Sequence, residues 1–284
     1  MPVVSVHPIT LPGSDLQVRV SAPTSGHDRP VVVFSHGFGQ SATAYDPLAQ
    51  YWAGQGFIVI QPTHLDSRTV NLPPEDPRTP LIWRLRIDDL RRTLDHLEHL
   101  ESAVPGLSGR TDHARIAVAG HSWGAQTAST LLGARVEGVD EDLSDPRVQA
   151  GVLLAVTGRG GADLSPFAAE HFPFMSPDFT TMTTPALIVA GEHDDSPLSV
   201  RGPDWFTDAY HLSPPGKSLL TLSGAEHSLG GITGHESTET TDESPQRVAL
   251  LRRLTVSYLR ETLKLGDSGW PAPVEEALGR LESR

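Results

Sequence analysis

Short apolar runs recur along the chain, and residues typical of turns flank each of them. They occupy positions 31–34, 57–60, 115–119, 151–154, 186–190 and 218–222. The runs are continuous rather than alternating, which is typical of parallel strands that helices cover on both faces. Before them, segments 3–10 and 16–21 flank the turn residues at 12–15, a pattern that predicts an antiparallel hairpin at one edge of the sheet.

Segments with helical periodicity separate these runs. The segment 80–100 opens with a proline and spaces its leucines mostly as a helix requires. The segment 123–132 follows the run at 115–119 directly, and 246–265 repeats apolar residues on one helical face. This alternation predicts an α/β fold, a doubly wound and mostly parallel sheet with helices on both faces and right-handed crossovers.

Two stretches depart from the alternation. Positions 156–183 form a long connection without a regular pattern and include the aromatic-rich run 171–175 (His-Phe-Pro-Phe-Met). Because connections of this length are usually lids or binding loops, we predict a short, irregular, lid-like segment around 156–183. Positions 230–245 are rich in Gly, Thr, Glu and Ser and predict a surface loop. Neither a repeat nor a linker divides the chain, so we predict one domain over residues 1–284.

One pentapeptide carries a specific chemical signal. Gly120-His121-Ser122-Trp123-Gly124 matches G-x-S-x-G, the nucleophile elbow, in which a serine sits on a sharp turn from a strand into a helix. The context that the motif requires is present, because a predicted strand precedes it and a predicted helix follows it. The N–H groups at the start of that helix also point at developing negative charge. We therefore predict Ser122 as a catalytic nucleophile.

A serine nucleophile needs a base, and the base needs an acid that orients it. In elbow-type sites the acid and then the histidine follow the serine, each after a later strand. The run at 186–190 leads into Gly-Glu-His-Asp-Asp at 191–195, and the run at 218–222 leads into a turn that contains His227. We predict His227 as the base. Asp194 is the preferred acid because it stands three residues past the turn glycine, with its neighbour Asp195 as the alternative.

The oxyanion of an acyl-transfer intermediate needs two backbone N–H donors. We predict that Trp123, directly after the nucleophile, provides one of them. The glycine-bracketed turn Ser35-His36-Gly37-Phe38-Gly39 follows the first central strand, and there Phe38 is the predicted second donor. We expect a neighbouring apolar substrate pocket, lined by these two residues and by His36, Phe172, Phe174 and Met175.

Together these features resemble the α/β-hydrolase family over roughly residues 16–265. The segments His-Gly-Phe-Gly-Gln-Ser at 36–41, Gly-Phe-Ile-Val at 56–59 and the elbow are similar to its bacterial chlorophyllase-like and dienelactone-hydrolase-related branch, which is related to polyester hydrolases. The resemblance implies the α/β-hydrolase fold and carboxylic ester hydrolysis without a metal or organic cofactor. Unlike secreted polyester hydrolases, which normally carry a signal peptide and often a disulfide, this chain shows neither.

The composition of the chain argues against several classes of binding partner and cofactor. The formal net charge is −13 and no basic stripe is present, which argues against a nucleic-acid partner. The chain has no cysteine, which excludes disulfides, thiolate metal ligands and a cysteine nucleophile. The histidines show no metal-ligand spacing such as H-E-x-x-H, so we expect no metal. With no signal peptide and no apolar stretch of membrane-spanning length, we expect a cytoplasmic protein without a membrane span.

The sequence thus predicts a serine esterase that forms an acyl-enzyme on small, hydrophobic or uncharged esters. The same three residues could instead hydrolyse lactones, thioesters or amides, or transfer an acyl group to another acceptor, because a fold does not dictate function. A non-catalytic ligand-binding protein on the same scaffold is a further alternative. Nothing in the sequence indicates an oligomeric state.

Overall fold

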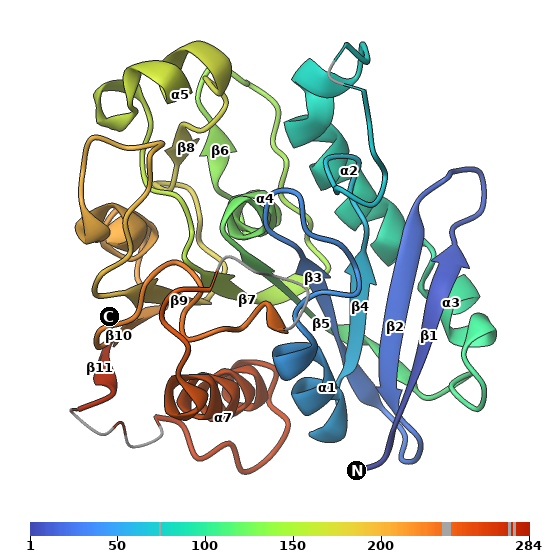
Figure 1. Cartoon of the computed structure of the whole chain (residues 1–284). Helices are drawn as coiled ribbons and strands as arrows, with labels where there is room; N and C mark the ends of the chain where they lie inside the picture. The colour runs from blue at the N-terminus through green and yellow to red at the C-terminus, as the bar shows by residue number, and fades with distance from the viewer. Residues whose placement is uncertain (74, 235–239, 272–273, 275–276) are drawn as a thin grey trace.

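A nine-stranded sheet crosses the whole molecule (Figure 1). The computed structural model describes residues 1–284 except 74, 235–239, 272–273 and 275–276. The strand order is β1-β2-β4-β3-β5-β7-β9-β10-β11. The strands are β1 (Val3–Thr10), β2 (Gln17–Pro23), β3 (Arg29–Ser35), β4 (Ile58–Pro62), β5 (Thr111–His121), β7 (Val148–Leu154), β9 (Ala186–Gly191), β10 (Lys217–Leu222) and β11 (Gly279–Ser283).

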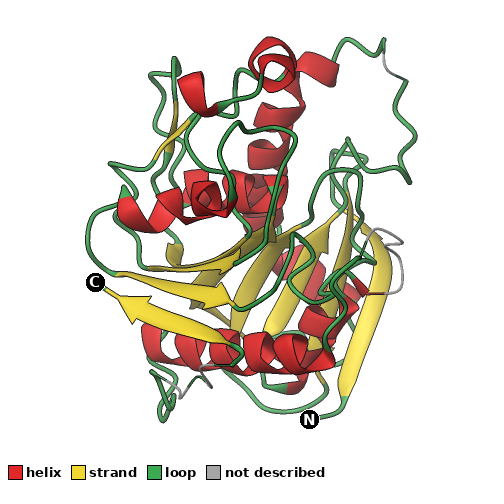
Figure 2. Ribbon diagram, turned by 60° about the vertical axis from the view of Figure 1, so that its left-hand side comes forward, coloured by secondary structure: helices red, strands yellow, loops and turns green. Residues whose placement is uncertain are grey.

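The six strands from β4 to β10 in this order run parallel, while β1, β2 and β11 are antiparallel to their neighbours. Helices α1 (Asp46–Gly54) and α7 (Pro245–Thr262) pack on one face and contact each other. Helices α2 (Ile82–Asp95) and α4 (Trp123–Leu131) pack on the other, and Figure 2 shows both layers. This confirms the predicted mostly parallel sheet between helices, with the β1–β2 hairpin at one edge.

The structure differs from the sequence prediction in several elements. The expected helix 80–100 is a 3₁₀ turn (Thr79–Leu81) and two helices, α2 and α3 (Leu97–Ala103), because His96 leaves the helical conformation at φ −113° and ψ 23°. Helix α1, the short helix α6 (Asp208–His211) after a 3₁₀ turn (Pro203–Thr207), and edge strand β11 were not predicted.

The segment 156–183 is less irregular than predicted. It contains a 3₁₀ turn (Gly161–Asp163), helix α5 (Pro166–His171) and strand β8 (Pro177–Asp178), which pairs with β6 (Arg135–Val136). Helix α5 starts at a sequence signal that we overlooked, since Ser165 accepts the Ala168 N–H and a proline follows it. Of the loop predicted at 230–245, positions 235–239 lie outside the described residues, and the described positions before α7 form turns and bends.

Candidate active site

The strand β5 passes into helix α4 through Ser122, which has φ 54° and ψ −124°. This backbone conformation is strained for a residue with a side chain, and such strain persists only where the surroundings impose it. Close packing provides that constraint. A Cβ at Gly124 would collide with the carbonyl oxygens of Ser35 and His36, and a Cβ at Gly120 would collide with the backbone of Gly124. The two glycines therefore allow the turn to lie directly against the end of β3.

Three side chains from separate loops form a hydrogen-bonded chain at the carboxyl ends of the strands. His227 Nε2 lies 2.9 Å from Ser122 Oγ. On the other side of the ring, His227 Nδ1 lies 3.0 and 3.1 Å from the two carboxylate oxygens of Asp194. This arrangement orients the imidazole so that Nε2 can take the serine proton.

The two neighbouring aspartates have different environments. The Asp194 side chain is fully buried, and burial raises its pKa against the opposing hydrogen bond from His227. Asp195 is exposed and its Oδ1 accepts the N–H of Ser196, as in an ordinary turn. The structure therefore brings Asp194 to His227 and leaves Asp195 outside the hydrogen-bonded chain.

The loop after β3 holds the peptide between Gly37 and Phe38 in one orientation. The backbone N–H of His64 donates to His36 Nε2 at 2.9 Å, so His36 carries its proton on Nδ1. That Nδ1–H donates to the carbonyl oxygen of Gly37 at 2.7 Å. Because C=O and N–H of a trans peptide point in opposite directions, the Phe38 N–H points away from His36. Within the described residues, neither the N–H of Phe38 nor that of Trp123 donates to a protein acceptor.

His36 is only 1% exposed, and both of its ring nitrogens are bonded. We predicted it as a residue of the substrate pocket, and this is wrong, since the ring lies behind the loop and supports it. Burial, together with the neighbouring His64 and Arg86, lowers the pKa of His36 well below its ordinary value. The ring therefore stays neutral, as its two hydrogen bonds require.

A buried ion pair also supports this loop, and the sequence analysis missed it. The guanidinium of Arg86 is fully buried and donates to Asp66 Oδ1 at 2.6 Å, as well as to the carbonyl oxygen of His36. Asp66 Oδ2 in turn accepts the Gly39 N–H at 3.1 Å. The Arg86 Cζ also lies 4.8 Å from the centre of the Trp123 ring. One side chain thus contacts both segments that carry the predicted oxyanion donors.

The charge of Asp66 depends on this pair. Burial raises the pKa of Asp66, but Arg86 and the two buried histidines lower it more, and the result is about 2. A sequence signal for Arg86 does exist, because it stands four residues from both Ile82 and Leu90 on the buried face of α2. A charged residue within an apolar stripe calls for a buried partner.

A second Ser-His-Asp chain lies beneath the first. Ser35 Oγ is 2.9 Å from His64 Nε2, and His64 Nδ1 is 2.9 Å from Asp89 Oδ2. Ser35 is fully buried, and its Oγ also accepts a hydrogen bond from Arg86. A serine without access to substrate is no nucleophile, so this chain supports the loop.

Aromatic rings form a continuous row beside Ser122. Trp123 lies between the rings of Phe38 and Phe174, with centroids 5.7 and 5.5 Å away. Phe174 also contacts Phe172 at 6.0 Å, and Gln126 of α4 donates to the carbonyl oxygen of Phe174. The structure therefore brings four of the predicted pocket and oxyanion residues together. Met175, also predicted for the pocket, is buried with 4% exposure.

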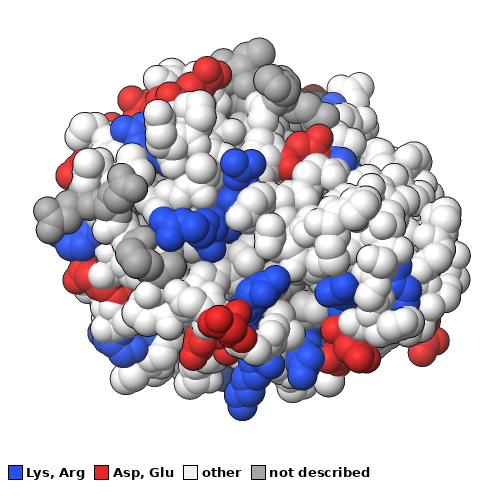
Figure 3. All heavy atoms as spheres, turned by 90° about the horizontal axis from the view of Figure 1, so that it is seen from below, with Lys and Arg blue, Asp and Glu red and all other residues white. Residues whose placement is uncertain are grey.

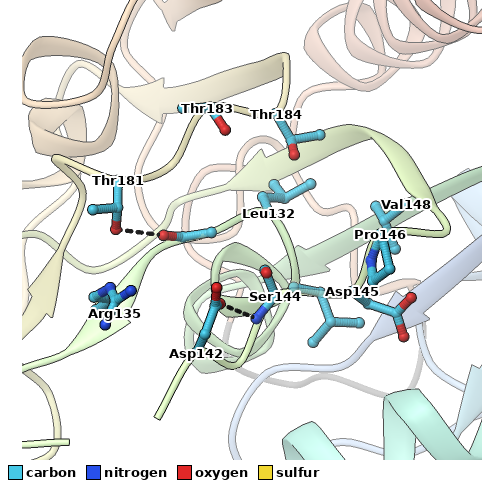
Figure 4. A pocket seen from close by; sticks show the side chains of 12 residues that line it. Leu132, Arg135, Asp142, Ser144, Asp145, Pro146, Val148, Thr181, Thr183 and Thr184 are labelled. Carbon is cyan, nitrogen blue, oxygen red and sulfur yellow. Dashed lines mark hydrogen bonds between the residues drawn. The ribbon is translucent and has the colours of Figure 1, made fainter. Parts of the chain in front are cut away.

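Polar hollows also lie away from the aromatic row. One, of about 280 Å³, lies beyond the C-terminal end of α4 and is lined by polar and charged side chains that include Arg135, Asp142 and Asp145 (Figure 4). Nine helical residues separate it from Ser122, about 13 Å along the helix axis. It therefore cannot serve the same reaction.

The second hollow, of about 400 Å³, is lined among others by Arg29, Arg115, Arg260 and Lys264. Basic and acidic side chains share the face of the molecule seen from below in Figure 3. The three arginines already have acceptors within the chain, such as the carbonyl oxygen of Gln55 for Arg260. No group of side chains with metal-binding geometry occurs in the described part of the chain.

Comparison with protein families identifies a relationship for the N-terminal half of the chain. Residues 4–139 match the family model described as Chlorophyllase, a segment that runs from β1 past α4 and includes the loop at 35–39 and Ser122. No curated protein matches the chain. Within the described residues, no helix has both the length and the apolar character to span a membrane.

Proposed function

We propose that this chain, which belongs over residues 4–139 to the chlorophyllase family of α/β-hydrolases, hydrolyses carboxylic esters through an acyl-enzyme on Ser122. The family is one of serine ester hydrolases. The observation that carries the proposal is the hydrogen-bonded chain from Ser122 through His227 to Asp194. The matched segment ends before His227 and Asp194, so this geometry supports their roles independently of the family match.

In the proposed reaction, His227 Nε2 takes the proton of Ser122 as Oγ attacks the ester carbonyl. The tetrahedral oxyanion receives hydrogen bonds from the N–H groups of Phe38 and Trp123, and the buried Asp194 stabilises the imidazolium. His227 then gives the proton to the leaving alcohol. Water, deprotonated by His227, attacks the acyl-enzyme and releases the acid.

The aromatic row indicates which esters the site accepts. The ring of Phe38 is 61% exposed and packs on the buried ring of Trp123, directly after the nucleophile, while the partly buried Phe174 packs on the other side of Trp123. A charged group there would lose hydration without gaining a partner. We therefore infer hydrophobic or uncharged substrates. We also propose that the segment 156–183, which supplies Phe172 and Phe174, covers one side of the site, and that residues 1–284 form one domain around the single large sheet.

A substrate panel tests this function. Wild type and Ser122→Ala are assayed with p-nitrophenyl esters from acetate to decanoate, beside lactones, thioesters and aryl amides. We expect turnover of uncharged esters to exceed that of amides and of an ester with a charged acyl group. Ser122→Ala should lose at least about 10⁴-fold in kcat. Ester turnover that survives in purified Ser122→Ala would contradict the proposal, and a preference for lactones or amides would redirect it.

A further inference from the structure

The ring of His121, within the elbow, can be assigned one tautomer from its contacts. His121 Nε2 lies 2.8 Å from the backbone carbonyl oxygen of His227, and a carbonyl oxygen only accepts. The ring is 4% exposed, and burial, with the neighbouring His227, lowers its pKa to about 3, so it is neutral. Nε2 therefore carries the proton, and Nδ1 is an acceptor.

This assignment fixes the hydrogen bonds of the next group. Tyr45 Oη lies 3.0 Å from His121 Nδ1, so the phenol O–H donates to the ring. The same oxygen accepts the backbone N–H of Gly37 at 2.9 Å. Tyr45 is fully buried and its ring packs 4.7 Å from that of Phe34, which restricts its rotation.

The three bonds point in one direction and join separate segments. They run from the Gly37 N–H to Tyr45, from Tyr45 to His121, and from His121 to the carbonyl oxygen of His227. Gly37 precedes the Phe38 donor in the loop after β3, His121 precedes the nucleophile, and His227 is the proposed base. The Gly37 peptide groups are then held on both sides, because His36 binds the carbonyl.

We propose that Tyr45 and His121 are positioning residues that hold the oxyanion donor Phe38 and the base His227 in register with Ser122. This inference rests on the proposed function, since it assigns roles within the same site. Neither side chain touches the reacting atoms, and both act through the backbone that they bind. Their loss should therefore lower kcat and leave KM nearly unchanged, because a transition-state contact is misplaced while substrate binding is kept.

The kinetic test compares Tyr45→Phe, His121→Leu and His121→Gln with wild type. Tyr45→Phe removes one oxygen and leaves the ring packing, and we expect kcat to fall about 10- to 100-fold with KM within about twofold. His121→Leu should lose at least as much. His121→Gln, whose amide can both donate and accept, should recover part of that loss. The matched control is Tyr258→Phe, a buried phenol of α7 that packs on Trp270 and should keep wild-type kcat.

A second measurement does not depend on activity. In protein labelled with ¹⁵N-histidine, long-range ¹H–¹⁵N spectra identify each ring tautomer, and Tyr45→Phe helps to assign the signal of His121. We expect His121 as the Nε2–H tautomer and His36 as the Nδ1–H tautomer. The opposite tautomer of His121, or wild-type kcat in both Tyr45→Phe and His121→Leu, would overturn the inference. A wild type that hydrolyses no ester would instead contradict the proposed function, while the spectra still decide whether the hydrogen-bond chain exists.

Discussion

Replacing Arg86 by methionine removes the cation of the buried pair and leaves the carboxylate of Asp66 without a counter-ion. Both side chains are at most 1% exposed, so solvent cannot compensate. Breaking such a pair from one side costs about 3–5 kcal/mol, and the lost contact with the Trp123 ring adds about 1 kcal/mol. We therefore expect Arg86→Met to lower the free energy of unfolding by about 5 kcal/mol, measured by urea denaturation at pH 7.

The loss of stability in Arg86→Met should depend on pH. In wild type the pKa of Asp66 is about 2, below the ordinary value of 3.8, so its stabilisation is present above pH 3.8 and lost as pH falls through 2. In Arg86→Met, burial without the cation should raise this pKa. The deficit relative to wild type should then grow as pH rises from 3.8 toward this raised pKa, because the unfolded chain releases the Asp66 proton that the folded variant still holds.

Two variants complete the design. Arg84→Met, two residues earlier on α2, breaks only solvent-exposed pairs, with Glu141 and Asp88, and should cost less than about 1 kcal/mol. Adding Asp66→Asn to Arg86→Met removes the unpaired charge and should recover about 2 kcal/mol. A loss for Arg86→Met that equals that of Arg84→Met, or one that does not change with pH, would refute the reasoning.

Three further outcomes are expected. His36, His64 and His121 are buried and their pKa values are lowered, so the stability that they contribute above pH 6.5 should be lost as pH falls. Between pH 7 and 5 the free energy of unfolding should fall by about 2 kcal/mol for each histidine. Urea titrations at the two pH values test this, and equal stability at both would contradict it. Asp194→Asn should lower kcat about 10⁴-fold, while Asp195→Asn should stay within about threefold of wild type; steady-state ester kinetics decide, and the reverse order moves the acid to Asp195. Gly124→Ala should lower the free energy of unfolding by about 3 kcal/mol or prevent folding, because its methyl group meets the backbone of Ser35. In the control Gly202→Ala, the methyl group meets nothing within 4 Å. Equal thermal stability of the two variants would refute the packing account.

The central sheet could be predicted from the sequence because its strands are buried on both faces. A continuous apolar run such as Val31-Val32-Val33-Phe34 indicates a strand that is buried on both faces. Strand β11 could not be predicted, since Leu281 is its only large apolar residue and the strand forms by pairing with the edge of β10. The break between α2 and α3 was missed for a related reason, because the apolar spacing continues across His96.

Some residues of the candidate site could likewise be located from the sequence, and others could not. Ser122 and the turns that carry Asp194 and His227 could be located because each follows a recognisable strand. The partners of Tyr45 and Arg86 could not be located, because contacts such as Tyr45–His121 and Arg86–His36 join residues that lie 76 and 50 positions apart in the sequence. The choice between Asp194 and Asp195 depended on which side chain the turn buries, and the pattern of the sequence leaves that open.

Labelling with a fluorophosphonate tests the central claim most directly, because the probe reacts only with a serine that an adjacent base has activated. Intact-protein mass spectrometry should show a single adduct, and peptide mapping should place it on Ser122. A hydrolysable uncharged ester should slow the labelling, Ser122→Ala should abolish it, and His227→Ala should slow it strongly. An unlabelled but folded wild type, or an adduct that persists in Ser122→Ala, would contradict the account.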